Sequence, residues 1–356
     1  MKTNSVTNCV SRRGRAVIGA ALAGATIFLA LIAANTNAAS HSPGGDRTDS
    51  RGENEQPQSA GGAVGSDGEV GTVELPEQSI SASPLPARRP LPGAREMQAI
   101  AATYPERVER VELKDGDWAA LIDGQWYYWS RGRLLREELR GRHEQFTPIR
   151  FYNYYLGPLR IPQVDPQLEA RLENILDDRQ ANPPVRHPGF QDALYGLSSY
   201  DEANDKMRNI DFLGFKTRMH PLATQALEKV EADIRERSAH DKEVAEFVRG
   251  LSTVAGFNWR NISGTRARSL HSYGIAIDLI PRYYDGDYGY WKWAAEADVD
   301  EWWKLGEEER FTVPQPIIDA FERHGFVWGG KWLFFDPIHF EYRPEVFELS
   351  NSPPND

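Results

Sequence analysis

The run "GIAIDLIP", residues 274–281, is the feature that most limits how this chain can fold. It is apolar and β-prone, as in a buried strand, yet Asp278 lies in its middle with apolar neighbours on both faces. A buried carboxylate without a partner is costly, and a bound cation is one of the few things that stabilise it. His271 lies just before this strand, and Gly274 between them permits a tight turn. A cation bound near the start of the strand is therefore one interpretation of these residues.

A second β-prone run, "FFDPIHFEY" at residues 334–342, holds Asp336, His339 and Glu341. Two histidines and one aspartate would supply three N/O ligands, the number that catalytic zinc sites take from the protein. The alternative is a salt-bridged aspartate and two histidines in the core. These residue types alone leave both interpretations open.

The surrounding sequence predicts a mixture of helices and strands. Residues 220–239 and 241–251 space their apolar side chains at helical intervals, and residues 313–325 predict a short helix that ends near His324. Upstream, Asp123-Gly124 separates two β-prone runs, which is typical of a hairpin. His143, His187 and His220 are expected at the surface.

Aromatic residues are dense in two regions, and each region has two interpretations. Around the hairpin they suit either cross-strand packing or a ligand-stacking surface. A set of tryptophans further along the chain either packs in the core or lines a groove for a glycan or peptide: Trp291, Trp293, Trp302, Trp303, Trp328 and Trp332. The long aromatic segment at residues 283–309 is a candidate lid or specificity loop.

The N-terminus predicts export. Residues 1–39 carry Lys2, Arg12, Arg13 and Arg15 without an acid, followed by a small and apolar run. This segment is either a cleaved signal peptide or an uncleaved membrane anchor, and both place the rest of the chain in a periplasmic or extracellular location. The sole cysteine, Cys9, precedes the apolar run, so disulfides and cysteine metal sites are excluded from the exported part.

Residues 40–95 are rich in Gly, Ser, Pro and acidic residues and predict a disordered linker. Loss of residues 1–39 would remove four positive charges and no negative ones, which takes the formal charge from −11 to about −15. Nucleic acid is therefore excluded as a partner, because its binding needs positive charge. A tether to the membrane would have to come from the N-terminal segment.

Both chemistry-bearing stretches resemble one enzyme family. Ser269, His271, Gly274, Ala276 and Asp278, followed by "GFVWGGKW" and then Asp336-x-x-His339-Phe340-Glu341, resemble the zinc D-alanyl-D-alanine carboxypeptidases and L-alanyl-D-glutamate endopeptidases of the M15 peptidase family. The resemblance covers roughly residues 220–345, and both halves match in order and in internal spacing.

The resemblance implies a role for each matching residue. His271, Asp278 and His339 match the ligands of Zn²⁺, and Asp336 matches the general base. Glu341 is the rival base, although a role in orienting a ligand suits it better.

The family also uses an arginine upstream of the first ligand to contact its substrate. Arg260 is the first candidate here and Arg266 the second, because a guanidinium can grip a carboxylate with two hydrogen bonds. Both could instead belong to structural ion pairs.

The implied fold is α+β, with helices packed on a small central antiparallel sheet that carries the zinc site, as in the Hedgehog/DD-peptidase-like proteins. Residues 166–348 would form this peptidase domain and residues 96–165 a small β-rich accessory module. The implied substrates are peptidoglycan stem peptides, cut by a D-alanyl-D-alanine carboxypeptidase. The alternatives are an L-alanyl-D-glutamate endopeptidase and a non-catalytic, zinc-containing module that binds the cell wall.

Overall fold

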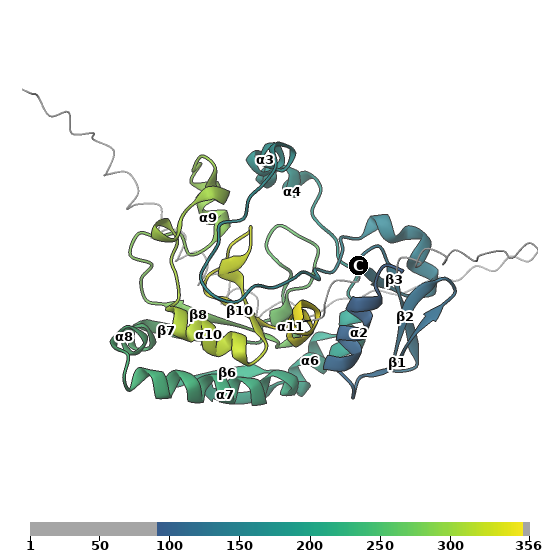
Figure 1. Cartoon of the computed structure of the whole chain (residues 1–356), viewed down its shortest axis with the longest axis horizontal. Helices are drawn as coiled ribbons and strands as arrows, with labels where there is room; N and C mark the ends of the chain where they lie inside the picture. Colours follow the sequence, from purple (N-terminus) through teal and green to yellow (C-terminus); the bar gives the residue numbers. More distant parts are fainter. Residues whose placement is uncertain (1–90, 352–356) are drawn as a thin grey trace, which may run out of the picture. The chain divides into compact units, whose positions relative to one another are not determined.

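The computed structural model of the chain describes residues 91–351 (Figure 1). The predicted export segment and nearly all of the predicted linker lie outside the described residues. Residues 91–351 all belong to one compact unit of the chain. Within this range, no helix has the length and apolar character needed to cross a bilayer.

The described part begins with a helix and a four-stranded antiparallel meander. The strands follow one another in chain order, and a 3-10 helix comes after the last of them. The elements are α2 (Ala94–Thr103), β1 (Val108–Lys114), β2 (Asp117–Ile122), β3 (Gln125–Ser130), β4 (Arg133–Leu135) and η2 (Glu137–Gln145). We call residues 94–151 the N-terminal module.

The predicted hairpin at Asp123-Gly124 is confirmed. Ile122 pairs with Gln125, so the loop has two residues, and both have positive φ, 49° at Asp123 and 70° at Gly124. Such a turn matches the twist of the flanking strands, and it favours Asp and Gly because most side chains resist positive φ. Among the aromatic side chains on these strands, Tyr127 and Tyr128 are buried, and Trp129 packs against Phe151 with ring centroids 5.7 Å apart.

A second antiparallel sheet has the strand order β7-β8-β10-β9. Its strands are β7 (Leu251–Ala255), β8 (Ala276–Pro281), β9 (Phe326–Trp328) and β10 (His339–Tyr342). A separate two-stranded hairpin is formed by β5 (Arg208–Phe212) and β6 (Phe215–Met219). The two central strands of this four-stranded sheet, β8 and β10, thus carry the candidate ligands Asp278 and His339.

Helices connect and surround these strands. The α-helices are α3 (Pro166–Glu173), α4 (Ile175–Ala181), α5 (Gly189–Tyr195), α6 (Tyr200–Lys206), α7 (Pro221–Ser238), α8 (Lys242–Gly250), α9 (Trp291–Glu296), α10 (Gln315–Arg323) and α11 (Pro344–Asn351). The 3-10 helices are η3 (Leu270–Tyr273), η4 (Trp302–Lys304), η5 (Glu307–Glu309) and η6 (Gly329–Lys331). The combination of helices with small antiparallel sheets agrees with the predicted α+β class.

One face of the central sheet is apolar because side chains alternate along a strand. Ile277 and Leu279 of β8 and Phe340 of β10 join a core cluster with α7 and α10. The ring of Phe340 stacks on Phe321 of α10 with centroids 3.9 Å apart. Asp278 lies between Ile277 and Leu279, and His339 directly precedes Phe340, so both polar side chains lie on the opposite face.

A second core cluster joins the N-terminal module to the elements around the candidate site. It combines Met97 and Ile100 of α2 with Leu194 of α5, Tyr273 of η3 and Ala276 of β8. Helix α2 also lies beside α11, as Figure 1 shows, and Arg95 donates to the carbonyl of Leu349. The N-terminal module is thus packed on the elements that surround the candidate ligands.

The expectation that His220 lies at the surface is wrong, because its side chain is buried. Its Nδ1 accepts from the backbone N–H of Leu222 at the start of α7, and its Nε2 donates to the carbonyl of Tyr195. The imidazole thus satisfies one backbone N–H at the N-terminus of α7, where Pro221 has no N–H to offer, and one carbonyl at the last residue of α5.

Candidate metal centre

Three side chains from η3, β8 and β10 converge on one point. Asp278 and His339 are direct partners across the two central strands, and η3 places His271 beside them. Asp278 Oδ1 lies 3.1 Å from His271 Nε2 and 2.7 Å from His339 Nδ1, and the two ring nitrogens are 3.2 Å apart. All three residues are buried, and together they form a group able to hold a metal ion.

The turn that joins His271 to the strand depends on Gly274. This residue ends η3 with φ of 62°, and a Cβ there would lie only 2.8 Å from the backbone nitrogen of His220. Ser269 caps the same helix by accepting from the backbone N–H of His271, so it supports the loop. A glycine is therefore required at this position both by its φ and by its surroundings.

The far ring nitrogen of each histidine has its own acceptor. His271 Nδ1 donates to the carbonyl of Gly256 at 2.7 Å, and His339 Nε2 donates to Glu341 Oε1 at 3.2 Å. The near nitrogens and Asp278 Oδ1 then present lone pairs to one another, which repel unless a proton or a cation lies among them. Metal-binding histidines have this pattern of outer hydrogen bonds, so the three residues fit Zn²⁺.

The electrostatics of the cluster favour positive charge. Burial would raise the pKa of Asp278, but the neighbouring imidazoles, His271 first, hold it well below its usual range. Burial would lower the pKa of His339, but hydrogen bonds to Asp278 and Glu341 raise it to about 10. Without a metal, a proton is therefore retained where a cation would otherwise bind.

Asp336 lies at the start of the turn that leads into β10. Its N–H donates to the carbonyl of Gly329, and its own carbonyl accepts from the N–H of His339. Within residues 91–351, no hydrogen bond or ion pair occupies its carboxylate. Burial is the largest effect on this group and raises its pKa to about 7, with Asp278 and Glu341 adding to the rise against the opposing charges of His339 and Arg260. A free carboxylate with a pKa near neutrality is suited to accept a proton from water.

The two candidate arginines lie in different environments. Arg260 is half-buried, and its charge acts on both Asp336 and Tyr290. Arg266 is exposed, and among the described residues its side chain makes no hydrogen bond or ion pair with the cluster. The structure thus brings Arg260 near the candidate base and leaves Arg266 apart from it.

Further residues near the cluster were not predicted individually. Tyr284 and Tyr290, from the candidate lid, have pKa values raised by burial and by the charge of Asp336. Arg186 has a pKa lowered to about 10 by burial, which the charge of Glu341 partly opposes, and its Nε has no hydrogen-bond partner among residues 91–351. The aromatic composition of residues 283–309 pointed to the tyrosines, but no sequence signal marked Arg186.

The tryptophans divide between core and site. Trp291, Trp302, Trp303 and Trp328 are buried, and Trp293 is only partly buried. Trp332 is also partly buried, and its ring centroid lies 5.6 Å from that of His339 while its Nε1 donates to the hydroxyl of Tyr152. Packing explains most of the set, and Trp332 is the member beside the ligands.

Comparison with known families gives two matches. Residues 263–342 match a peptidase M15 family model described as D-alanyl-D-alanine carboxypeptidase, and residues 96–151 match one described only as a domain of unknown function. No curated protein and no solved structure matches the chain. The first match supports the M15 peptidase family and contains all three candidate ligands together with Asp336, whereas Arg260 lies outside it.

Proposed function

We propose that this chain is an exported zinc metallopeptidase that hydrolyses peptide bonds in peptidoglycan stem peptides, with D-alanyl-D-alanine carboxypeptidase activity. The observation that carries the proposal is the buried group of His271, Asp278 and His339 beside the free carboxylate of Asp336. The M15 match over the same residues supports a peptidase.

His271 Nε2, His339 Nδ1 and a carboxylate oxygen of Asp278 would hold the metal. A bound Zn²⁺ would polarise the scissile carbonyl and acidify a water molecule. Three protein ligands leave room for that water, as in catalytic rather than structural zinc sites. Gly256 and Glu341 keep the imidazoles in the required tautomers by accepting their outer N–H groups.

Asp336 moves the proton in this reaction. Its carboxylate takes a proton from the attacking water as the oxygen bonds to the scissile carbon, and returns it to the leaving amine when the C–N bond breaks. Tyr284 and Tyr290 lie near enough for Asp336 to affect their pKa values, and with their protons retained they can donate hydrogen bonds to a developing oxyanion.

A carboxypeptidase must recognise the free carboxylate at the end of its substrate. Arg260 and Arg186 supply positive charge next to Asp336 and Glu341, and the buried Nε of Arg186 lacks a partner among residues 91–351. A guanidinium in such a position can bind a carboxylate with two hydrogen bonds. This argument favours cleavage at the chain end over internal cleavage of the stem.

The test is incubation of the zinc-loaded full chain with purified peptidoglycan, followed by mass analysis of the products. Release of single D-alanine residues is the expected result. Fragments cut between L-alanine and D-glutamate would instead identify an endopeptidase. Binding without any product would leave the non-catalytic cell-wall module as the better interpretation.

A further inference from the structure

Polar residues continue along the strand beyond the ligand His339. Strand β10 places Phe340 in the core, while His339 and Glu341 contact each other on the opposite side. The other oxygen of Glu341, Oε2, lies 3.6 Å from Nη1 of Arg343, the residue that follows the strand. One carboxylate thus joins the imidazole of a candidate ligand to a guanidinium.

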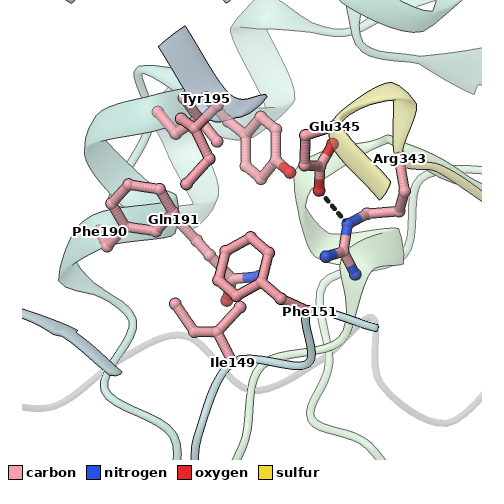
Figure 2. Close-up of a pocket in the computed structure, with 9 residues that line it drawn as sticks. Ile149, Phe151, Phe190, Gln191, Tyr195, Arg343 and Glu345 are labelled. Atoms are coloured by element: carbon pink, nitrogen blue, oxygen red, sulfur yellow. Dashed lines mark hydrogen bonds and ion pairs between the residues drawn. The ribbon is translucent and has the colours of Figure 1, made fainter. Parts of the chain in front are cut away.

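Arg343 makes two further contacts that lead away from the site. Its Nε donates to Glu345 Oε1, as Figure 2 shows, and its Nη2 donates to the carbonyl of Arg150 at 3.0 Å. Glu345 Oε2 in turn accepts from the hydroxyl of Tyr104 at 2.9 Å. Both Tyr104 and Arg150 belong to the N-terminal module, so two of its residues are bonded to this network.

The network is buried at the residues that link it together. Tyr104, Arg343 and Glu345 are 4%, 7% and 4% exposed. Burial alone would lower the pKa of Arg343, but Glu345 and Glu341 hold it well above its usual range. Because a buried charge that loses its partner is strongly destabilised, each group in the series restrains its neighbours.

A purely structural contact between α11 and the module would not need to reach the metal centre. Here the two carboxylates lie on either side of Arg343, and the inner one, Glu341, also accepts from His339 Nε2. The orientation of the Glu341 carboxylate, and with it that of the imidazole, therefore depends on where Arg343 is held.

We infer that the N-terminal module is a positioning element of the metal centre: Tyr104 and Arg150 fix Arg343 through Glu345 and through a direct backbone contact, and Arg343 fixes the Glu341 carboxylate that orients His339. This inference rests on the proposed metal-binding function of the cluster. It assigns a role to the segment that matches only a domain of unknown function. Tyr104, Glu345, Arg343 and Glu341 are positioning residues, since they act through His339 rather than on a substrate.

The experiment titrates the metal-free full chain with Co²⁺ and records visible absorption, which reports ligand geometry as well as affinity. Tyr104→Phe removes only the hydroxyl that donates to Glu345. Tyr128→Phe is the control, because Tyr128 is another tyrosine of the same module with a buried side chain, and its hydroxyl donates to Asp115 at a partly buried position away from the network. Arg343→Lys tests the next position, because lysine keeps the positive charge but loses the planar guanidinium that donates several hydrogen bonds at once.

We expect Glu341→Gln to weaken Co²⁺ binding by about 10-fold or more, the usual scale for an outer partner of a ligating histidine. Arg343→Lys and Tyr104→Phe should weaken Co²⁺ binding by about threefold or more and shift the absorption band. Each variant loosens a residue that holds the Glu341 carboxylate, directly for Arg343 and through Glu345 and Arg343 for Tyr104. Tyr128→Phe should retain both the affinity and the spectrum of the wild type. Thermal unfolding of every variant identifies loss of fold.

If Tyr104→Phe and Arg343→Lys both keep the wild-type affinity and spectrum, the inference is overturned while the proposed function stands. Equal losses in Tyr104→Phe and Tyr128→Phe would also overturn it, because they would indicate a general loss of stability in the module. Absence of Co²⁺ binding by the wild type would overturn the inference and the proposed metal-dependent function together.

Discussion

Asp278 and His339 face each other as cross-strand partners on β8 and β10, with Asp278 Oδ1 2.7 Å from His339 Nδ1. Sheet register alone therefore brings together two candidate ligands that lie far apart in the sequence. His271 joins them from the 3-10 helix that immediately precedes β8. The following predictions test what this cluster and its surroundings do.

The first prediction concerns the metal. The full chain should carry about one zinc ion, and His339→Ala should lose most of it because one of three ligands is missing. His324→Ala is the matched control, since His324 ends α10 and bonds to Asp233 outside the cluster. Elemental analysis of the purified proteins measures the zinc. Equal zinc in His339→Ala and the wild type would remove His339 from the site.

The second prediction separates the base from the ligands. Asp336→Ala should retain zinc but lose activity by about 100-fold or more, because the proton acceptor is lost and the ligands remain. At saturating zinc, Glu341→Ala should be milder, since its carboxylate acts by orienting His339. Rates on a peptidoglycan fragment, with zinc content measured in parallel, provide the comparison. The opposite order of rates would assign the base to Glu341.

The third prediction concerns recognition of the substrate. Arg260→Lys should lower kcat/KM for a stem peptide with a free C-terminus by about 30-fold, equivalent to about 2 kcal/mol, because lysine keeps the charge but loses the second hydrogen bond. Arg266→Lys is the control, as Arg266 is exposed and makes no hydrogen bond or ion pair with the cluster among the described residues. Amidation of the substrate should slow the wild type far more than Arg260→Lys. Equal wild-type rates on free and amidated peptides would refute the idea that Arg260 binds the C-terminal carboxylate of the substrate.

The fourth prediction is a pH dependence of stability. Burial is the main reason that the pKa of His220 falls to about 4, below the ordinary value near 6.5. The unfolded chain therefore binds a proton that the folded chain resists, so stability is fully present above about pH 6.5 and is lost as the pH falls towards 4. The loss attributable to His220 at pH 5 is up to about 2 kcal/mol.

His220→Asn should reduce this dependence, because asparagine can still accept from the N–H of Leu222 but does not titrate. Urea unfolding of the metal-free protein at pH 7 and pH 5 gives the two free energies for each variant. The variant should be less stable at pH 7, since the bond to the carbonyl of Tyr195 is lost. An equal decrease between pH 7 and pH 5 in both proteins would exclude His220 as the titrating group.

Local patterns in the sequence predicted the parts of the protein that depend on near neighbours. The β-prone run around Asp278 predicted a buried strand with a carboxylate in its middle, and Asp123-Gly124 predicted a hairpin. Both depend on backbone geometry and on side chains a few positions apart, which is why short stretches suffice. The order and spacing of His271, Asp278 and His339 pointed to one cluster only through resemblance to a family.

The tertiary structure alone decided the relationships between distant segments. No local pattern pairs Tyr104 with Glu345 or places Arg186 near Glu341, because these contacts arise from how helices and sheets pack. His220 was wrongly expected at the surface for the same reason, because the carbonyl that stabilises its side chain in the core comes from Tyr195 on another helix. Sequence therefore determined which groups are available for chemistry, and packing decided which of them meet, because burial and long-range pairing depend on the whole fold rather than on neighbouring residues.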